Sequence, residues 1–185
     1  MTATIIAIII AIPVLIVIGL YNSMIKLRNN RENAFADIDV QLRQRHDLIP
    51  QLVETVRGYA KHESTTLQAV VEARNGARQA TSIDEKIAAE NKLSSALQGL
   101  KVTIESYPDL KANQNFMHLQ EEIADVENKL AASRRFFNSA TKEYNNSIQT
   151  FPANIVAGAF GFRKETFFEL GAERVVVSEV PKIQF

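Results

Sequence analysis

The first part of the chain is continuously apolar. From Met1 to Met24 no side chain is charged, and residues 5–20 are almost entirely Ile, Ala, Leu and Val, interrupted by Pro13 and Gly19. About 20 residues of helix rise roughly 30 Å, which matches the hydrocarbon core of a bilayer, and membrane helices tolerate a proline. We therefore predict a transmembrane anchor over residues 1–22. Its representative residues are Ile5, Ile10, Leu15 and Leu20.

The flanks of this segment indicate whether it is retained and how it is oriented. A cleaved signal peptide would carry basic residues before the apolar run and small residues at a cleavage site, and neither pattern is present. The helical pattern instead continues past Tyr21, so we predict an uncleaved anchor. Lys26, Arg28 and Arg31 follow the span and no charge precedes it. Since basic residues favour the cytoplasmic side, we expect a short N-terminus outside and the bulk of the chain in the cytoplasm.

After the anchor, apolar residues recur at alternating steps of three and four, which is typical of a coiled helix seam. Arg45 is the exception within the series, and the phase continues across Pro50. This continuity favours a helix that kinks at Pro50; the alternative is a new helix with Asp47 as N-cap and Pro50 in its first turn. The helical pattern is expected to fade near Ala80. The seam positions are Phe35, Ile38, Leu42, Ile49, Leu52, Val56 and Tyr59.

A second helix is predicted after residue 82. Ser82 and Glu85 have the spacing of a capping box, in which each side chain satisfies a backbone N–H of the other residue. This helix is expected to end at Tyr107, because a residue before proline, here Pro108, is disfavoured in helical conformation. Its apolar positions are Leu93, Leu97, Leu100 and Ile104.

A third long helix is predicted from Asn113 to the Phe151 and Pro152 pair. It keeps the same seam spacing, so the whole of residues 23–151 is predicted to form an antiparallel bundle of three or four long helices with short connections. The fold class is therefore all-α. The seam positions of this helix are Phe116, Leu119, Ile123, Val126, Leu130 and Phe137, followed by Ala140, Tyr144 and Phe151.

Residues 152–185 have no clear helical period and are predicted to form an irregular, phenylalanine-rich C-terminal tail. They include the β-branched run of Val175, Val176 and Val177. Two interpretations are open: the tail folds onto the flank of its own bundle, or it is an interaction tail that packs on another subunit or on lipid, because such aromatic surface is unusual in water. The candidate oligomer or lipid contacts are Phe160, Phe162, Phe167 and Phe168.

The composition argues against several classes of function. The chain has 185 residues with 21 Lys and Arg and 21 Asp and Glu, so its formal net charge is zero. A nucleic-acid binder normally shows a basic excess, and we therefore expect no nucleic-acid partner. The chain contains no cysteine, which excludes disulfides and thiolate chemistry.

The polar residues do not form a convincing catalytic or metal pattern. His46 and Asp47, or His62 and Glu63, could supply metal ligands, but the two histidines are sixteen residues apart. That separation is more than four helical turns, so they cannot share a site on one straight helix. Glycine loops and nucleophile–base arrangements are also missing. We predict no enzyme activity, no cofactor and no metal site.

A ladder of alternating charge lies on the first helix. Asp39, Arg43 and Asp47 are spaced four residues apart and fall on one helical face. Such a ladder is normally solvated, and in an oligomer the same charges would fix the register between copies.

The chain resembles the LemA family along its whole length. The resemblance is carried by several segments, among them residues 34–42, 58–60, 107–113 and 134–138, and by the family motif Arg45, His46, Asp47, Leu48 and Pro50. Phe35 stands where the family often has tryptophan, which keeps an aromatic ring at the seam. The resemblance implies a bacterial single-pass protein of the inner (cytoplasmic) membrane with a coiled helical domain and no established enzymatic activity. Family members are often encoded near membrane proteases, which suggests a partner role.

These patterns lead to two hypotheses for function. The first is a membrane-anchored, non-enzymatic scaffold that self-associates through its helical rod and C-terminal tail, and that could organise or shape the membrane. The alternative is an adaptor or sensor subunit that binds another membrane protein such as a membrane protease. The expected partners are the lipid bilayer, further copies of the chain and, under the alternative, a second membrane protein.

Overall fold

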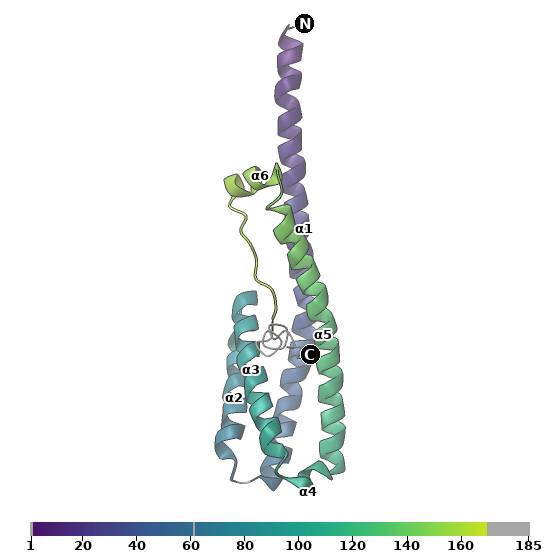
Figure 1. Cartoon of the computed structure of the whole chain (residues 1–185), viewed down its shortest axis with the longest axis vertical. Helices are drawn as coiled ribbons and strands as arrows, with labels where there is room; N and C mark the ends of the chain where they lie inside the picture. Colours follow the sequence, from purple (N-terminus) through teal and green to yellow (C-terminus); the bar gives the residue numbers. More distant parts are fainter. Residues whose placement is uncertain (1, 61, 170–185) are drawn as a thin grey trace, which may run out of the picture. The chain divides into compact units, whose positions relative to one another are not determined.

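The computed structural model describes residues 2–60 and 62–169. Over these residues the chain is all-α and contains no strand, as the sequence predicted. Figure 1 shows the helices in chain order. They are α1 (Thr2–Tyr59), α2 (Ser64–Gln79), α3 (Ile83–Ile104), α4 (Pro108–Lys111), α5 (Gln114–Ser147) and α6 (Ala153–Phe160).

The chain divides into two compact units. We call the first, Met1–Asp37 with Ser133–Phe167, the anchor unit, and the second, Ile38–Ala132 with Phe168–Phe185, the bundle unit. The long helices α1 and α5 each contribute to both units.

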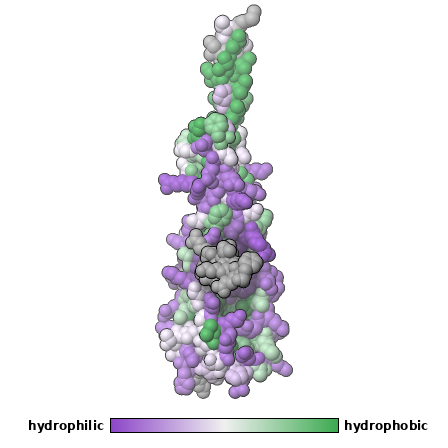
Figure 2. All heavy atoms as spheres, in the orientation of Figure 1, coloured by the Kyte–Doolittle hydropathy of each residue, from purple (hydrophilic) through white to green (hydrophobic). Residues whose placement is uncertain are grey.

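The first turns of α1 carry the apolar surface. Ile5, Ile10 and Leu15 are between 56% and 66% exposed, and Leu20 is half-buried. Figure 2 shows this apolar segment and the polar surface that follows it in the anchor unit. Within the described part of the chain, α1 is the one helix long and apolar enough to cross a membrane. The helix is thus consistent with a membrane anchor.

Helix α1 continues without interruption through Pro50. The structure therefore shows a continuous helix here and not a new helix that begins at Asp47. A proline inside a helix leaves the carbonyl four residues earlier without its usual partner. Here that carbonyl belongs to His46, and the Arg74 side chain of α2 donates to it at 2.7 Å. A neighbouring helix therefore replaces the hydrogen bond that Pro50 cannot make.

The helix predicted to fade near Ala80 in fact ends at Tyr59, and α2 is a separate helix. The end has little local cause beyond Gly58, because no proline follows it. Ala60 and Leu67 are instead both buried in the same core as Val56, and Ala60 accepts the backbone N–H of Glu63 in the intervening turn. Tertiary packing of α2 therefore overrides the local helical preference.

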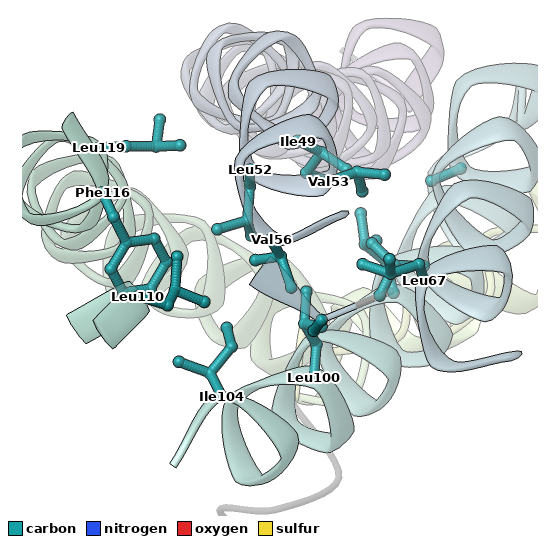
Figure 3. Close-up of a cluster of buried hydrophobic side chains, with 14 residues drawn as sticks. Ile49, Leu52, Val53, Val56, Leu67, Leu100, Ile104, Leu110, Phe116 and Leu119 are labelled. Carbon is teal, nitrogen blue, oxygen red and sulfur yellow. The ribbon is translucent and has the colours of Figure 1, made fainter. Parts of the chain in front are cut away.

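The core of the bundle unit collects apolar side chains from α1, α2, α3, α4 and α5 (Figure 3). Leu52 and Val56 of α1 lie between Phe116 of α5 on one side and Leu67 of α2 on the other, with Leu100 of α3 next to Val56. Burying one such aliphatic side chain contributes about 1.5–3 kcal/mol. The predicted seam positions are buried in one or the other unit, except that Leu97, Ile123 and Ala140 are half-buried and Tyr59 and Phe151 are exposed.

The start of α3 has the predicted capping box. The Ser82 hydroxyl accepts the backbone N–H of Glu85 at 3.2 Å, and the Glu85 carboxylate accepts the backbone N–H of Ser82 at 3.1 Å. These hydrogen bonds, with the largest contributions from the backbone amides of Ser82 and Thr81, lower the pKa of Glu85 to about 2. The prediction of this helix start is confirmed.

The predicted irregular tail contains a short helix, α6, which corrects that part of the prediction. Its residues Ala153, Val156 and Ala157 are buried against Met24 and Tyr144 within the anchor unit. The eight residues are too few for a periodic signal, and this packing stabilises them as a helix. Gly161 ends the helix in the left-handed conformation, with φ of 73°. Residues 162–169 follow without regular structure, and the run Val175, Val176 and Val177 lies outside the described residues.

Candidate functional site

The bundle unit contains a buried cluster of charges built around Arg45. Arg45 occupies a seam position of α1 and is 4% exposed. Its guanidinium donates to the Glu90 carboxylate of α3 at 3.0 Å and to the Ser94 hydroxyl at 3.1 Å, and pairs with Glu127 of α5 at 2.8 Å. One side chain thereby connects three helices. We call Arg45, His46, Glu90 and Glu127 the charge cluster.

His46 completes the charge cluster from the next position of α1. Its Nε2 lies 2.6 Å from the second oxygen of Glu90, which is 1% exposed. Both oxygens of this carboxylate are therefore engaged, one by His46 and the other by Arg45. A buried carboxylate would be very costly without such partners, so the three side chains are mutually dependent.

A cavity of about 400 Å³ lies beside the charge cluster within the bundle unit. Its polar wall includes Asp39, which hydrogen-bonds both to Lys86 of α3 and to Arg43 one turn along α1. Burial acts to raise the pKa of Asp39, but the hydrogen bonds and charges of Lys86 and Arg43 outweigh it and hold the pKa below its usual value. Asp47, Arg78 and the edge of Glu90 also line this space.

The predicted charge ladder is thus only partly a solvated surface. Arg43 is exposed, whereas Asp39 turns towards Lys86 and ties α1 to α3. The mixed charges of this wall suit hydrogen bonding to protein groups. Glu90, the one buried carboxylate of the charge cluster, accepts from Arg45 with one oxygen and contacts His46 with the other.

The residues considered for metal binding do not come together. His46 is in the charge cluster, while His62 is exposed in the turn after α1 and Glu63 accepts a hydrogen bond from Tyr107 at 3.1 Å. Among residues 2–60 and 62–169, no three His, Asp or Glu side chains form a group that could hold a metal ion.

A second buried polar group lies in the anchor unit, where it fixes the segment after α6. Arg31 of α1 is 3% exposed and pairs with the Glu165 carboxylate at 3.2 Å. It also donates to the Thr141 hydroxyl at 3.2 Å and to the backbone carbonyl of Thr166 at 3.3 Å, and its guanidinium stacks 4.8 Å from the centre of the Phe137 ring. A single arginine therefore joins α1, α5 and the extended segment.

Helix α5 adds two backbone attachments to this segment. The Tyr144 hydroxyl donates to the carbonyl of Arg163 at 3.0 Å, and the Asn145 amide exchanges two hydrogen bonds of 2.9 Å with the backbone of Glu165. Burial, together with the charge of Glu165, raises the pKa of Tyr144, so its hydroxyl remains a donor. We call Arg31, Tyr144 and Asn145 the tail clamp.

The phenylalanines proposed as partner contacts have different environments. Phe162 is half-buried and packs on Tyr21 with ring centres 5.6 Å apart, and Phe168 is 2% exposed. Phe168 is therefore buried, and its role as a contact for a neighbour or for lipid stays a prediction. Phe160 also contacts Tyr21, at 5.0 Å, but remains 58% exposed, and Phe167 is 40% exposed.

The family motif divides between the core and the surface. Arg45 and His46 enter the charge cluster, Leu48 is half-buried beside the apolar core, and Asp47 and Pro50 are exposed.

The sequence interpretation missed Glu90, and the seam pattern contained the signal for it. Glu90 lies three residues before Leu93 and so occupies a seam position of α3, just as Arg45 occupies one of α1. Opposite charges at two apolar positions predict a buried pair. Arg31, four residues before Phe35, follows the same rule.

Comparison with known proteins places the chain among membrane-associated proteins of uncertain function. The model of the LemA family matches residues 34–185. Protein LemA of Metamycoplasma hominis is 26% identical over 86% of this chain and 74% of its own length. Magnetosome protein MamQ of Magnetospirillum gryphiswaldense is 21% identical over 80% of this chain, which spans 64% of that protein. Magnetosome protein MamQ 2 of Paramagnetospirillum magneticum is also 21% identical, again with 64% of its length covered.

Proposed function

Because the chain belongs to the LemA family, we propose that it is a membrane-anchored, non-enzymatic scaffold that associates with further copies of itself through its helices. The anchor is the apolar start of α1, and the same helix continues into the bundle core without a flexible linker. The membrane is the inner membrane of a bacterium, with the bundle unit in the cytoplasm. The basic residues Lys26, Arg28 and Arg31 directly after the span support this orientation.

The observation that carries self-association is a groove with an exposed aromatic ring at its edge. The groove lies between α1 and α5 in the anchor unit and has a volume of about 540 Å³. Phe136, which is 60% exposed, lines it together with the small side chains of Ala34, Ser139 and Ala140. The exposed ring lies next to a hollow lined by small residues, and a contact that fills the hollow with such a ring would remove apolar surface of both from water.

A second copy of the chain is the occupant that fits this groove. In a twofold interface the same surface serves both partners, so a protruding ring and a receiving hollow must be on one patch. Phe136 and the groove satisfy this condition, since each ring can enter the groove of the other copy. The polar ends of the groove, Asn30, Asp37 and Glu143, would form its rim.

The remaining geometry favours a structural role over catalysis. In the charge cluster, Arg45 and His46 each contact one oxygen of the buried Glu90 carboxylate, which supports a role in holding α1 and α3 together. The relatives have names that refer to a family or to the magnetosome, and none of these names states a reaction.

The proposal is tested by measuring the mass of the full chain in mild detergent, with Phe136→Ser as the variant. We expect an oligomer at micromolar concentration for the native chain and a shift towards monomer for Phe136→Ser. Val102→Ser is the matched control, because Val102 is 63% exposed and does not line this groove. A native chain that remains monomeric, or equal association in both variants, would overturn this assignment. Crosslinking to a different membrane protein in place of a copy would favour the adaptor alternative.

A further inference from the structure

We propose that α6 is a second membrane contact, an interfacial helix whose exposed apolar face enters the boundary between the lipid headgroups and acyl chains where α1 leaves the bilayer. This inference rests on the proposed function in one respect, namely that α1 spans the membrane. It adds that the folded tail, and not only the N-terminal span, binds lipid.

Helix α6 has two apolar faces, of which only one is covered by protein. Its sequence is ANIVAGAF, with no charged residue. Ala153, Val156 and Ala157 are buried against α1 and α5 in the anchor unit. Ile155 lies on the side of α6 away from these buried residues and is 65% exposed, and Phe151 just before the helix is 80% exposed. Phe160 ends the helix on the side that meets Tyr21 and is still 58% exposed. We call Phe151, Ile155 and Phe160 the α6 face.

The position of α6 places this face at the end of the candidate span. Phe160 packs on Tyr21 with ring centres 5.0 Å apart, and α6 shares a buried cluster with Met24, next to half-buried Leu20. Tyr21 directly follows the apolar run, where aromatic residues typically lie at the membrane surface. Figure 1 shows α6 running across the direction of the adjoining part of α1. A helix across a spanning helix lies in the plane of the membrane.

Basic side chains follow both the span and α6 along the chain. Arg163 and Lys164 are exposed immediately after α6, and Arg28 of α1 lies over the Phe162 ring at 5.9 Å. Anionic lipid headgroups attract such residues, with roughly 1 kcal/mol for each Lys or Arg near the surface. An apolar face bordered by basic residues is the pattern of helices that lie on membranes. Figure 2 shows the apolar surface over α6 close to that of α1.

Lipid is a better partner for the α6 face than another protein, because the proposed span already places this part of the chain beside the bilayer. The α6 face and the apolar surface of α1 are connected through Tyr21 and Leu20 within one unit. Moreover, the tail clamp holds the backbone at Arg163 through Tyr144 and at Glu165 through Asn145, so Arg163 and Lys164 stay close to the end of α6.

The chain contains no cysteine, so each cysteine introduced for the test is a single labelling site. Nitroxide spin labels are placed by Ile155→Cys and, as a second site on the same face, Phe151→Cys. Leu15→Cys reports the span and Val102→Cys reports a water-exposed helix. The full chain is reconstituted in vesicles of phosphatidylcholine with phosphatidylglycerol, and collision rates with oxygen and with a water-soluble nickel complex are compared.

We expect the labels at residues 155 and 151 to favour oxygen over nickel severalfold relative to residue 102, with a depth shallower than that of residue 15. Nickel access at residue 155 equal to that at residue 102 would overturn the inference. Shielding of residue 155 from both reagents would also overturn it, because a second copy or another part of the protein would then cover α6. If residue 15 itself is open to nickel, the proposed anchor fails first, and that result is distinguishable from failure of α6 alone.

Discussion

Arg31, Arg45 and Glu90 are buried charges at positions where a helical seam normally has an apolar side chain. Each has charged or polar partners from other segments of its unit, so burial is tolerated. Such groups contribute less to net stability than a well-packed leucine would, but they penalise arrangements in which the partner is absent. At this scale, we infer that the charges specify which helices meet.

The dependence of Arg45 on Glu90 gives a first prediction. Glu90→Ala leaves the Arg45 guanidinium and His46 without their shared partner in a buried place, and we expect the free energy of unfolding to fall by about 3–5 kcal/mol. Chemical denaturation of the full chain in detergent, followed by circular dichroism, measures this loss.

Two further variants make that prediction specific. Glu54→Ala removes an exposed pair with Arg57 and should cost less than about 1 kcal/mol. Combining Glu90→Leu with Arg45→Met should be far less harmful than Glu90→Ala, since it removes both partners of the buried pair and Glu127, which also loses Arg45, is 34% exposed to solvent. Equal losses of unfolding free energy for Glu90→Ala and Glu54→Ala would show that the buried pair contributes no more to stability than the exposed pair.

At the scale of the elements, helix ends with a local cause were predictable and those with a tertiary cause were not. The start of α3 follows from Ser82 and Glu85, which act within one turn. The end of α1 at Tyr59 depends on the burial of Leu67, eight residues later in a different helix, and α6 depends on packing against Met24. The charge cluster was predictable only in principle, because matching Arg45 to Glu90 requires knowing which helices adjoin.

The capping box at the start of α3 predicts a pH dependence. The pKa of Glu85 is about 2 in the folded chain and near 4.5 as its ordinary value. Because the folded value is the lower one, the stabilisation by the carboxylate is complete above pH about 4.5 and is lost as the pH falls towards about 2. Glu85→Gln keeps an acceptor but cannot titrate. The difference in unfolding free energy between the native chain and Glu85→Gln should therefore shrink over that window, and a constant difference would argue against the capping role.

The proline in α1 predicts a coupling between two helices. Arg74 donates to the His46 carbonyl that Pro50 leaves free, so Arg74→Met should cost about 1–3 kcal/mol by leaving that group unsatisfied. In a Pro50→Ala background the backbone N–H of residue 50 can bond to the same carbonyl, and Arg74→Met should then cost clearly less. A double-mutant cycle by denaturation measures the difference. Additive effects would mean that Arg74 does not compensate for Pro50.

At the scale of the whole molecule, α1 serves two environments with one continuous helix. Its first part exposes Ile and Leu side chains, whereas its last part, from Ile49 to Val56, is buried in the bundle core. The composition averages these two parts, which is why the formal net charge of zero and the neutral mean hydropathy conceal a strongly apolar segment.

The charges beside the apolar run predict how α1 is oriented in the membrane. With Lys26, Arg28 and Arg31 after the apolar run and no charged side chain in the run itself, we expect residue 2 outside and the bundle unit in the cytoplasm. Single cysteines at Thr2 and Val102 test this in intact cells with a maleimide that cannot cross the membrane. We expect Thr2→Cys to react at once and Val102→Cys to react only after the cells are permeabilised. Val102 is 63% exposed, so protection in intact cells would come from the membrane and not from burial in the bundle. The reverse labelling pattern would invert the orientation, and the interfacial contact of α6 would then belong to the outer leaflet.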